Sequence, residues 1–240
     1  MTLDAILFIT SLLTSIVSGV LGFGGGLLLL PIISLYLSPS VIIPIHGLTQ
    51  LASNSSRVLF SFKSVCWKLL PPFLVGSFLG VFVFGFLIAS LPVAYIPLAI
   101  GGYILLNMWS TRFSIFLSRY ENYYIIGFIQ TGLGLLVGAT GPLSLSILSK
   151  DLDNKDEIIA TSAIFMSISH VAKVPVFMLL GFSLLAHIHI IFYMVLGSII
   201  GSFIGIKLRK KTNNEQWFSI IKILLTLLAL KMIIEVLLGY

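Results

Sequence analysis

Charged residues and cysteine are scarce in this chain. Aspartate, glutamate, lysine and arginine make up only 9% of the 240 residues, whereas soluble domains carry about 25%. The single cysteine, Cys66, excludes an internal disulfide framework. Hydrophobic residues make up 58% of the sequence, and the mean hydropathy is +1.12. A water-soluble core of this size could not hold so many apolar side chains, so the composition predicts an integral membrane protein.

Signatures of enzymes and cofactor sites are also missing from the sequence. The patterns HExxH, CxxC, GxSxG and Walker A do not occur, and "GFGGG" neither fits GxGxxG nor follows a strand. We therefore predict no catalytic residue, no metal site and no cofactor. The net charge of +6 is divided among basic clusters that apolar segments separate. This pattern excludes a continuous nucleic-acid footprint and favours loops that face anionic lipid.

Eight apolar segments are present, and a helix that crosses a bilayer needs about 20 residues. The segments lack alternating polarity and exceed the length of a barrel strand, so we predict helices rather than strands. The predicted fold class is all-α, a polytopic membrane protein with one integral membrane domain. The segments are 4–36, 41–62, 68–90, 94–111, 121–148, 157–181, 187–207 and 215–238.

The two halves of the chain resemble each other. "GSFLG" at Gly76–Gly80 matches "GSIIG" at Gly197–Gly201, and the opening "GVLGFGGG" has a counterpart in "TGLGLLVGATGP". A repeat of about 115–120 residues is typical of duplicated transporters. We therefore predict a first transmembrane repeat at 1–115 and a second at 116–240.

Lysine and arginine in the predicted loops indicate an orientation, because positive residues prefer cytoplasmic loops. If all eight segments cross the membrane, the ten loop cations divide four against six. If segment 121–148 instead enters and returns on one face, all ten lie on the same side. The repeat predicts the same for segment 4–36, so that the halves are inverted and both termini lie outside. The ten cations are Lys63, Lys68, Arg112, Arg119, Lys150, Lys155, Lys207, Arg209, Lys210 and Lys211.

The glycine-rich stretches are predicted to interrupt helices inside the membrane. Glycine weakens a helix by about 1 kcal/mol relative to alanine. Irregular backbone at that depth is tolerated only where it is buried in protein or lines a cavity. We expect bare N–H groups to face a substrate cavity; the alternative is close helix packing with a mild kink. The residues concerned are Gly24, Gly25 and Gly26 in the first half, and Gly138, Thr140 and Gly141 in the second.

Polar side chains share one helical face in two corresponding segments. The faces consist of His46, Gln50, Ser53, Asn54 and Arg57 in segment 41–62, and of Ser162, Met166, Ser169, His170 and Lys173 in segment 157–181. Ionisable residues within a bilayer cost several kcal/mol and usually face a functional cavity.

Neither polar face carries an acidic residue, so positive side chains and helix N-termini favour a small anion over a cation. We predict substrate contacts from both faces. The alternatives are snorkelling of Arg57 and ordinary interhelical hydrogen bonds of the histidines. The predicted contacts are His46, Gln50, Asn54, Arg57, Ser169, His170 and Lys173.

Together these motifs resemble the sulfite exporter TauE/SafE family of membrane permeases. The matching pieces are "SGVLGFGGGLLLLPII", "HGLTQLASNSSRVLF", the paired "GSFLG" and "GSIIG", and the looser "GLGLLVGATGP", which together represent nearly the whole chain. The resemblance implies a permease of small anions, often sulfur-containing oxyanions or organosulfonates.

From the inverted repeats we expect alternating access at a midplane site, in a bacterial inner or plasma membrane. The expected partners are a small anionic substrate and the lipid bilayer. An anion channel, an intramembrane enzyme and a non-transporting scaffold are the alternatives.

Overall fold

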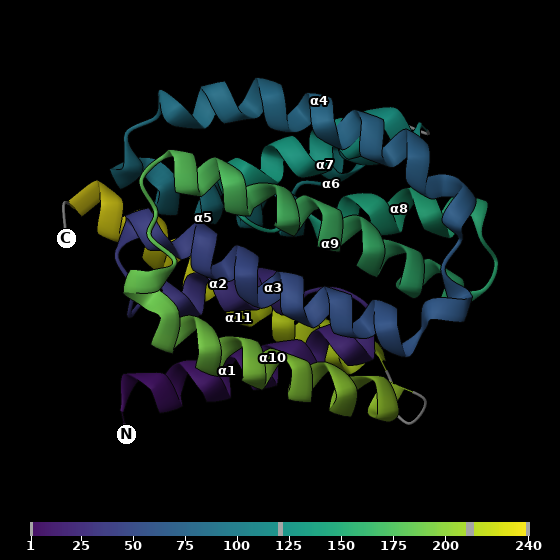
Figure 1. The fold of residues 1–240 in the computed structure, drawn as a ribbon, viewed down its shortest axis with the longest axis horizontal. Helices are drawn as coiled ribbons and strands as arrows, with labels where there is room; N and C mark the ends of the chain where they lie inside the picture. Colours follow the sequence, from purple (N-terminus) through teal and green to yellow (C-terminus); the bar gives the residue numbers. More distant parts are fainter. Residues whose placement is uncertain (1, 120–121, 210–213, 239–240) are drawn as a thin grey trace.

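The computed structural model describes residues 2–119, 122–209 and 214–238, and within them every regular element is a helix (Figure 1). The first half contains α1 (Leu3–Leu21), α2 (Gly25–Ile33), α3 (Pro39–Phe60), η1 (Phe62–Ser64), η2 (Trp67–Leu69), α4 (Leu70–Ala89), η3 (Val93–Tyr95), α5 (Ile96–Trp109) and α6 (Thr111–Ser118). The second half contains α7 (Tyr123–Val137), α8 (Gly141–Asp151), α9 (Lys155–Leu179), η4 (Leu185–His187), α10 (Ile188–Leu208) and α11 (Asn214–Leu238).

The prediction of an all-α membrane fold is confirmed. Among the described residues, four helical stretches are long and apolar enough to cross a membrane: α1, Trp67–Ala89, α9 and Leu185–Leu208. Helix α3 has 22 residues but falls outside this group, because its polar face lowers its hydropathy. Two of the predicted segments, 4–36 and 121–148, each contain two helices instead of one. The helix breaks predicted at the glycine-rich stretches are therefore present.

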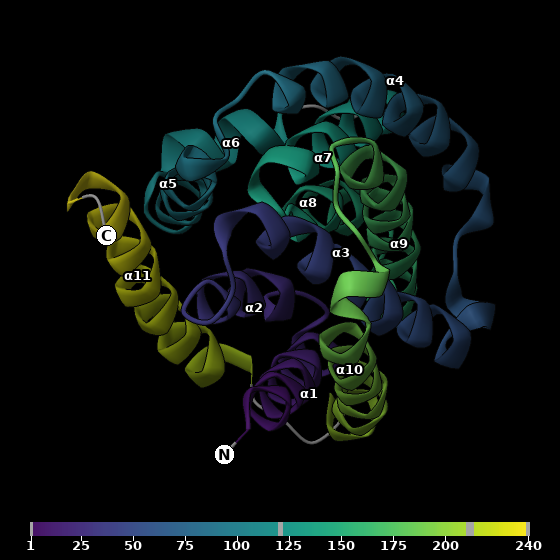
Figure 2. The same ribbon diagram turned by 60° about the vertical axis from the view of Figure 1, so that its left-hand side comes forward.

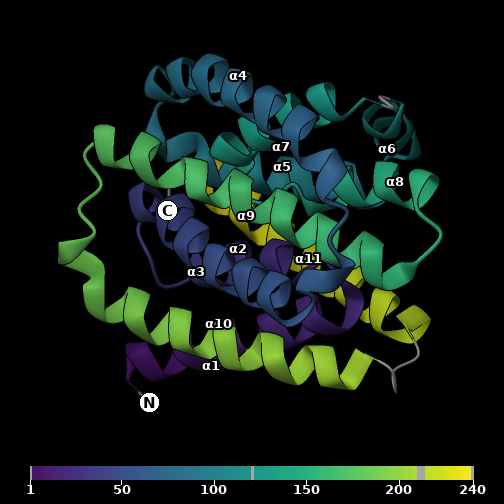
Figure 3. The ribbon, with the colours of Figure 1, turned by 45° about the vertical axis from the view of Figure 1, so that its right-hand side comes forward.

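The helices run along the long axis of the molecule, and their connections gather at its two ends (Figures 1 and 3). One end, which we call the basic end, holds the connection from α3 to α4, helix α6, the connection from α8 to α9, and the end of α10. The opposite end holds the start of α1, the connections from α4 to α5 and from α9 to α10, and the end of α11. The segments that carry eight of the ten loop cations lie at the basic end, while Lys210 and Lys211 fall outside the described residues.

Each broken helix forms a hairpin that starts and finishes on the same side (Figures 1 and 3). Helix α1 starts at the opposite end, and after the break α2 runs back toward it. Helix α7 starts at the basic end, and α8 returns there. Helices α3 and α9 lie side by side between the two hairpins and run in opposite directions (Figure 2).

Two helix pairs, α1 with α10 and α7 with α4, pack in parallel through glycine. A Cβ atom at Gly201 would lie 2.2 Å from the carbonyl oxygen of Leu12, and one at Gly76 would lie 1.9 Å from that of Tyr124. Only glycine permits such close approach of two backbones, which is how small residues promote helix association in membranes. The "GSFLG" and "GSIIG" motifs are therefore packing motifs, and each joins helices from different halves of the chain.

Candidate functional site

The first break lies between α1 and α2. Gly22 (φ 87°) and Gly24 (φ 91°) adopt backbone conformations that residues with a Cβ atom rarely adopt. The Gly22 N–H donates to the carbonyl of Ser18 at 2.8 Å and closes the last turn of α1. The chain then reverses and α2 starts at Gly25. The glycines at this point are thus required by the backbone conformation itself.

The second break lies between α7 and α8 and is built in the same way. Gly138 (φ 78°) ends α7, and its N–H donates to the carbonyl of Gly134 at 3.0 Å. Helix α8 starts at Gly141, and Pro142 occupies its first turn, where the missing N–H of proline has no helical partner to lose. Both broken helices therefore leave carbonyl groups at the end of their first arm.

A buried arginine occupies the carbonyl end of α1. Arg57 on α3 donates from Nη1 to the carbonyl oxygen of Gly22 at 2.9 Å and to that of Ser18 at 3.2 Å. Its Nη2 donates to Asn54 Oδ1. The side chain is 1% exposed, so Arg57 does not snorkel to the membrane surface. The positive charge sits where the helix dipole and unpaired carbonyls concentrate negative charge.

A buried lysine occupies the same place at the end of α7. Lys173 on α9 donates from Nζ to the Gly138 carbonyl, and it lies 2.9 Å from His170 Nδ1. A protonated Lys173 is a donor only, and with it His170 accepts at Nδ1. The side chain of Lys173 is 1% exposed. In both halves the cation lies 35 residues after the glycine and three residues after its polar partner.

The two polar faces meet where α3 and α9 lie side by side. The rings of His46 and His170 are 5.5 Å apart, edge to face. A Cβ atom at Gly47 would lie 3.1 Å from Lys173 Cδ, so the lysine stem covers this part of α3. The structure therefore brings His46, His170 and Lys173 together, whereas Asn54 and Arg57 are held at the first break.

The first turn of α8 is closed by side chains of its own hairpin. Gln130 Oε1 accepts the N–H of Ser144 at 3.0 Å, and Thr140 Oγ1 donates to the Gln130 carbonyl at 2.8 Å. Gln130 Nε2 donates to Ser169 Oγ at 3.3 Å. Three of the predicted substrate contacts in this half, Thr140, Gly141 and Ser169, thus lie at a helix start that the protein itself caps.

Within the described residues, no side chain accepts from an N–H of the first turn of α2, whose N-cap residue is Gly24. His46 Nε2 lies 3.0 Å from the carbonyl oxygen of Gly26, and a Cβ atom at Gly26 would lie 3.1 Å from Gln50 Oε1. Three buried polar atoms at this point have no hydrogen-bond partner within the described part of the chain. They are Oε1 and Nε2 of Gln50 and Nδ1 of His46. An unpaired buried polar group costs about 1–3 kcal/mol, so this cluster marks a place where a partner is missing.

Gly25 and Gly141 are both closely packed at the position that a side chain would occupy. A Cβ atom at Gly25 would lie 2.0 Å from the carbonyl oxygen of Thr14, so Gly25 is pressed against α1. At Gly141 the nearest atoms are Sδ and Cε of Met166, both at 3.1 Å. Of the five glycines predicted at the two breaks, only Gly24 has no atom within 4 Å of its Cβ position.

Sequence reasoning missed Gln130 and Ser144. The available signal was a glutamine inside the otherwise apolar stretch Tyr123–Val137, because polar residues at that depth usually have a partner. Among the hydrogen bonds of the buried polar side chains around the two breaks, none in the described residues goes to a carboxylate. No group of three or more metal-ligating side chains occurs in that part of the chain either.

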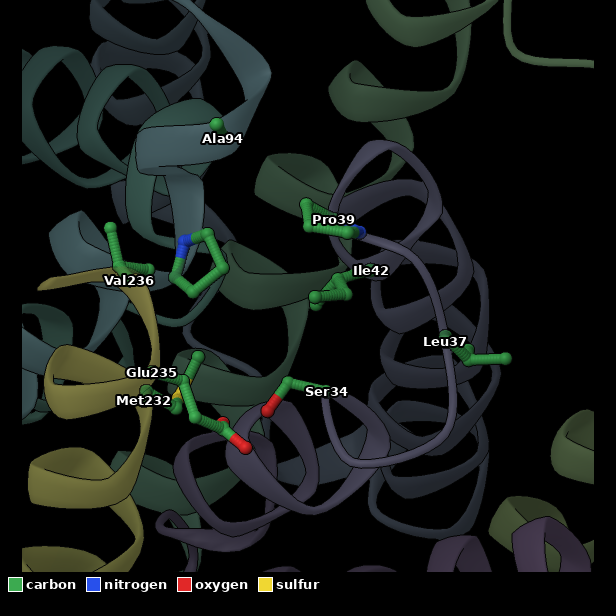
Figure 4. Close-up of a pocket in the computed structure, with 9 residues that line it drawn as sticks. Ser34, Leu37, Pro39, Ile42, Ala94, Met232, Glu235 and Val236 are labelled. Atoms are coloured by element: carbon green, nitrogen blue, oxygen red, sulfur yellow. The ribbon is translucent and has the colours of Figure 1, made fainter. Parts of the chain in front are cut away.

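Two pockets approach this region from the two ends. At the opposite end, a pocket of about 400 Å³ lies among α2, α3, α5 and α11, with Ser34 and Glu235 among its lining residues (Figure 4). At the basic end, a pocket of about 360 Å³ is lined by Phe23 of the first break and Pro142 of α8, together with Asn107 of α5. The second pocket therefore reaches both helix breaks.

The fold and the buried cations define an integral membrane protein whose polar interior, within the described residues, bonds to no carboxylate around the two breaks. The model of the family described as sulfite exporter TauE/SafE matches residues 7–232. The chain therefore belongs to this family of membrane transporters, and the resemblance seen in the sequence is confirmed. Comparisons with curated proteins and with solved structures found no match.

Proposed function

We propose that the protein is a secondary transporter of small oxyanions, with sulfur-containing oxyanions or organosulfonates as the expected class. The observation that carries this proposal is the pair of buried cations, Arg57 and Lys173, whose hydrogen bonds go to backbone carbonyls and uncharged side chains. Carbonyl dipoles offset only part of a full charge. A bound anion would offset the remainder, since an uncompensated charge in a low-dielectric interior is costly.

We further infer two inverted repeats, 1–115 and 116–240, that work by alternating access. Three features support this: the two hairpins start from different ends, α1 and α7 each pair with a helix of the other half, and the two cations bind equivalent glycine carbonyls. Inverted repeats allow the halves to exchange conformations and so to expose a central site to either face. The pockets at the two ends are the proposed routes of access.

Transport in proteoliposomes tests the proposal. Flux of sulfite, thiosulfate, an alkylsulfonate and a carboxylate is measured with and without an imposed gradient of pH or membrane potential, and choline serves as a cationic control. We expect saturable flux of at least one oxyanion, accumulation against its gradient, and none for choline. Flux that never saturates and never runs uphill would instead establish a channel. Absence of flux for every anion, together with no stabilisation of the purified protein by any of them, would refute anion transport.

A further inference from the structure

The two broken helices differ in how their second arm begins. In α8 the N–H of Ser144 is bonded to Gln130, so the protein supplies its own cap. In α2, a helix of nine residues, the N-cap is Gly24, and within the described residues no side chain accepts from an N–H of the first turn. A vacant helix N-terminus is a favourable position for an oxyanion because several N–H groups and the dipole point at it. A buried side chain with unpaired polar atoms also faces this turn.

Gln50 is that side chain. It is 0% exposed, and both its amide oxygen and its amide nitrogen lack a partner in the described residues. Its amide faces Gly26, where an added Cβ atom would lie 3.1 Å from Oε1 and 3.3 Å from Cδ. The absence of a side chain at Gly26 therefore lets the amide pack directly against this turn, and the neighbouring Gly24 borders open space. Gln50 is aimed at the first turn of α2 with unused hydrogen-bonding capacity.

The second half shows that a buried glutamine can be fully paired in this fold. Gln130 is also 0% exposed, yet its oxygen accepts from Ser144 N–H and its nitrogen donates to Ser169. On α9, the residue that corresponds to Gln50 is Met166, whose thioether lies 3.1 Å from the Cβ position of Gly141. The hydrogen-bonding group that faces α2 is thus replaced by an apolar one facing α8.

We propose that the transported oxyanion binds at the first turn of α2 and not at α8, and that Gln50 is a specificity-determining residue of this site. The inference rests on the proposed function. Gln50 Nε2 and the free N–H groups of the first turn of α2 donate to two or more oxygens of a compact sulfite, sulfonate or carboxylate group. Lys173, linked to this turn through His170 and His46, provides positive charge without direct contact.

Two reciprocal substitutions test the assignment. Gln50→Met removes both hydrogen-bonding atoms with little change in volume, and Met166→Gln is the matched control on α9. Affinity for sulfite, thiosulfate and an alkylsulfonate is measured by titration of the purified protein in detergent, with thermal unfolding of the ligand-free protein alongside. We expect Gln50→Met to weaken affinity by about tenfold or more without lowering the ligand-free unfolding temperature. Met166→Gln should change affinity by no more than about twofold, since a site remote from that residue loses no contact.

The outcomes separate this inference from the proposed function. If wild type binds an oxyanion and Gln50→Met binds it equally well, Gln50 does not contact it and the inference is overturned. A tenfold loss in Met166→Gln would place the site at α8 and overturn it as well. If wild type binds and transports no oxyanion, the proposed function itself fails. If Gln50→Met does not fold, Gly26→Ala is measured instead, because its methyl group would press against the Gln50 amide. Unchanged affinity in that variant would overturn the inference.

Discussion

In the first break Arg57 binds the carbonyls of α1, and in the second Lys173 binds the carbonyl that ends α7. In both, a glycine with positive φ ends the first arm and lies 35 residues before the cation, although the first break has a second such glycine, Gly24. What differs is the second arm: α8 is capped by Gln130, whereas α2 faces an unpaired Gln50. The shared features solve the problem of ending a helix inside a membrane, and the features that differ are those we connect with the substrate.

The structure also gives the two cations, Arg57 and Lys173, a role at the helix ends. The sequence suggests positive groups that face the anion directly, but in the structure both are bonded to helix ends. A helix C-terminus carries about half a negative charge, so a cation that caps it stabilises the fold before any substrate arrives. We therefore expect their substitution to affect stability as well as transport, to different extents in the two halves.

The largest expected effect concerns the orientation of the halves, because labelling is all or none. In a Cys66→Ser background, single cysteines replace Lys150 and Lys207 at the basic end and Ser183 at the opposite end. If the basic end is cytoplasmic, an impermeant thiol reagent should reach Ser183→Cys only from outside and the other two only from inside. Labelling of the Lys150 and Lys207 positions from different sides would contradict the hairpin arrangement. Tyr240, which the sequence also places outside, lies beyond the described residues.

The next largest effect is expected from glycine-to-leucine substitutions, which compare how tightly the two breaks are packed. Gly25→Leu forces a side chain into the backbone of α1, where Thr14 O is 2.0 Å from the Cβ position. We expect more than about 4 kcal/mol of destabilisation and loss of monodisperse protein on size-exclusion chromatography. The nearest atoms to the Gly141 position are at the flexible end of Met166, so Gly141→Leu should fold and keep its anion affinity, while its bulk hinders movement at the second break and lowers flux.

Gly85→Leu is the control for both variants, since no atom lies within 4 Å of that Cβ position. It should behave like wild type in chromatography and in flux. If Gly25→Leu and Gly141→Leu both fold and transport like wild type, neither break depends on close backbone contact.

Arg57→Gln should mainly lower stability, whereas Lys173→Gln should mainly weaken anion affinity. Arg57 supplies three hydrogen bonds and Lys173 two, so loss of Arg57 should lower the free energy of unfolding more, by about 3 kcal/mol. Lys173 is linked to the first turn of α2 through the two histidines, so its loss should weaken anion affinity more, by about tenfold. Thermal unfolding and anion titration on matched amounts of protein measure the two quantities.

The conservative variants Arg57→Lys and Lys173→Arg test whether charge alone suffices. Each should restore most of the lost affinity but less of the lost stability, because the two groups differ in hydrogen-bond geometry. If Arg57→Gln and Lys173→Gln keep normal stability and affinity, the cations neither cap the helices nor serve the anion.

The sequence predicts the helices, the two breaks and the polar faces because glycine clusters and helical spacing are local properties. It does not predict that α1 pairs with α10 and α7 with α4, since a small-residue motif indicates close packing but not the partner. It places Arg57 and Lys173 on the correct faces, yet their bonds to Gly22 and Gly138 depend on which helix end lies opposite. For the same reason, the cap provided by Gln130 and the contact between Gly25 and α1 become visible only in three dimensions.

The smallest expected effect concerns the two ends of the molecule. At the basic end Arg209 at the end of α10 pairs with Asp156 of α9 at 3.3 Å, and its Nε donates to the Gly19 carbonyl of α1 at 2.9 Å. In the proposed repeats, Ser40 corresponds to Asp156 and Ile88 corresponds to Arg209. These two residues lie at the opposite end and line a pocket of about 70 Å³. The ion pair thus ties the α1–α10 pair to α9 at the basic end, and it should favour closure of that end.

Asp156→Asn removes the charge of this pair and leaves the Arg209 bond to α1 in place. Because Asp156 is largely exposed, we expect at most about 1 kcal/mol of lost stability. The ratio of inward to outward flux in oriented proteoliposomes should shift by up to about threefold, since a bias of that size between two states corresponds to well under 1 kcal/mol. Lys231→Gln, which breaks a pair within α11 alone, should leave the ratio unchanged. High salt should reduce the difference between Asp156→Asn and wild type, because exposed pairs are screened. An unchanged flux ratio at low salt would show that the pair does not distinguish the two ends.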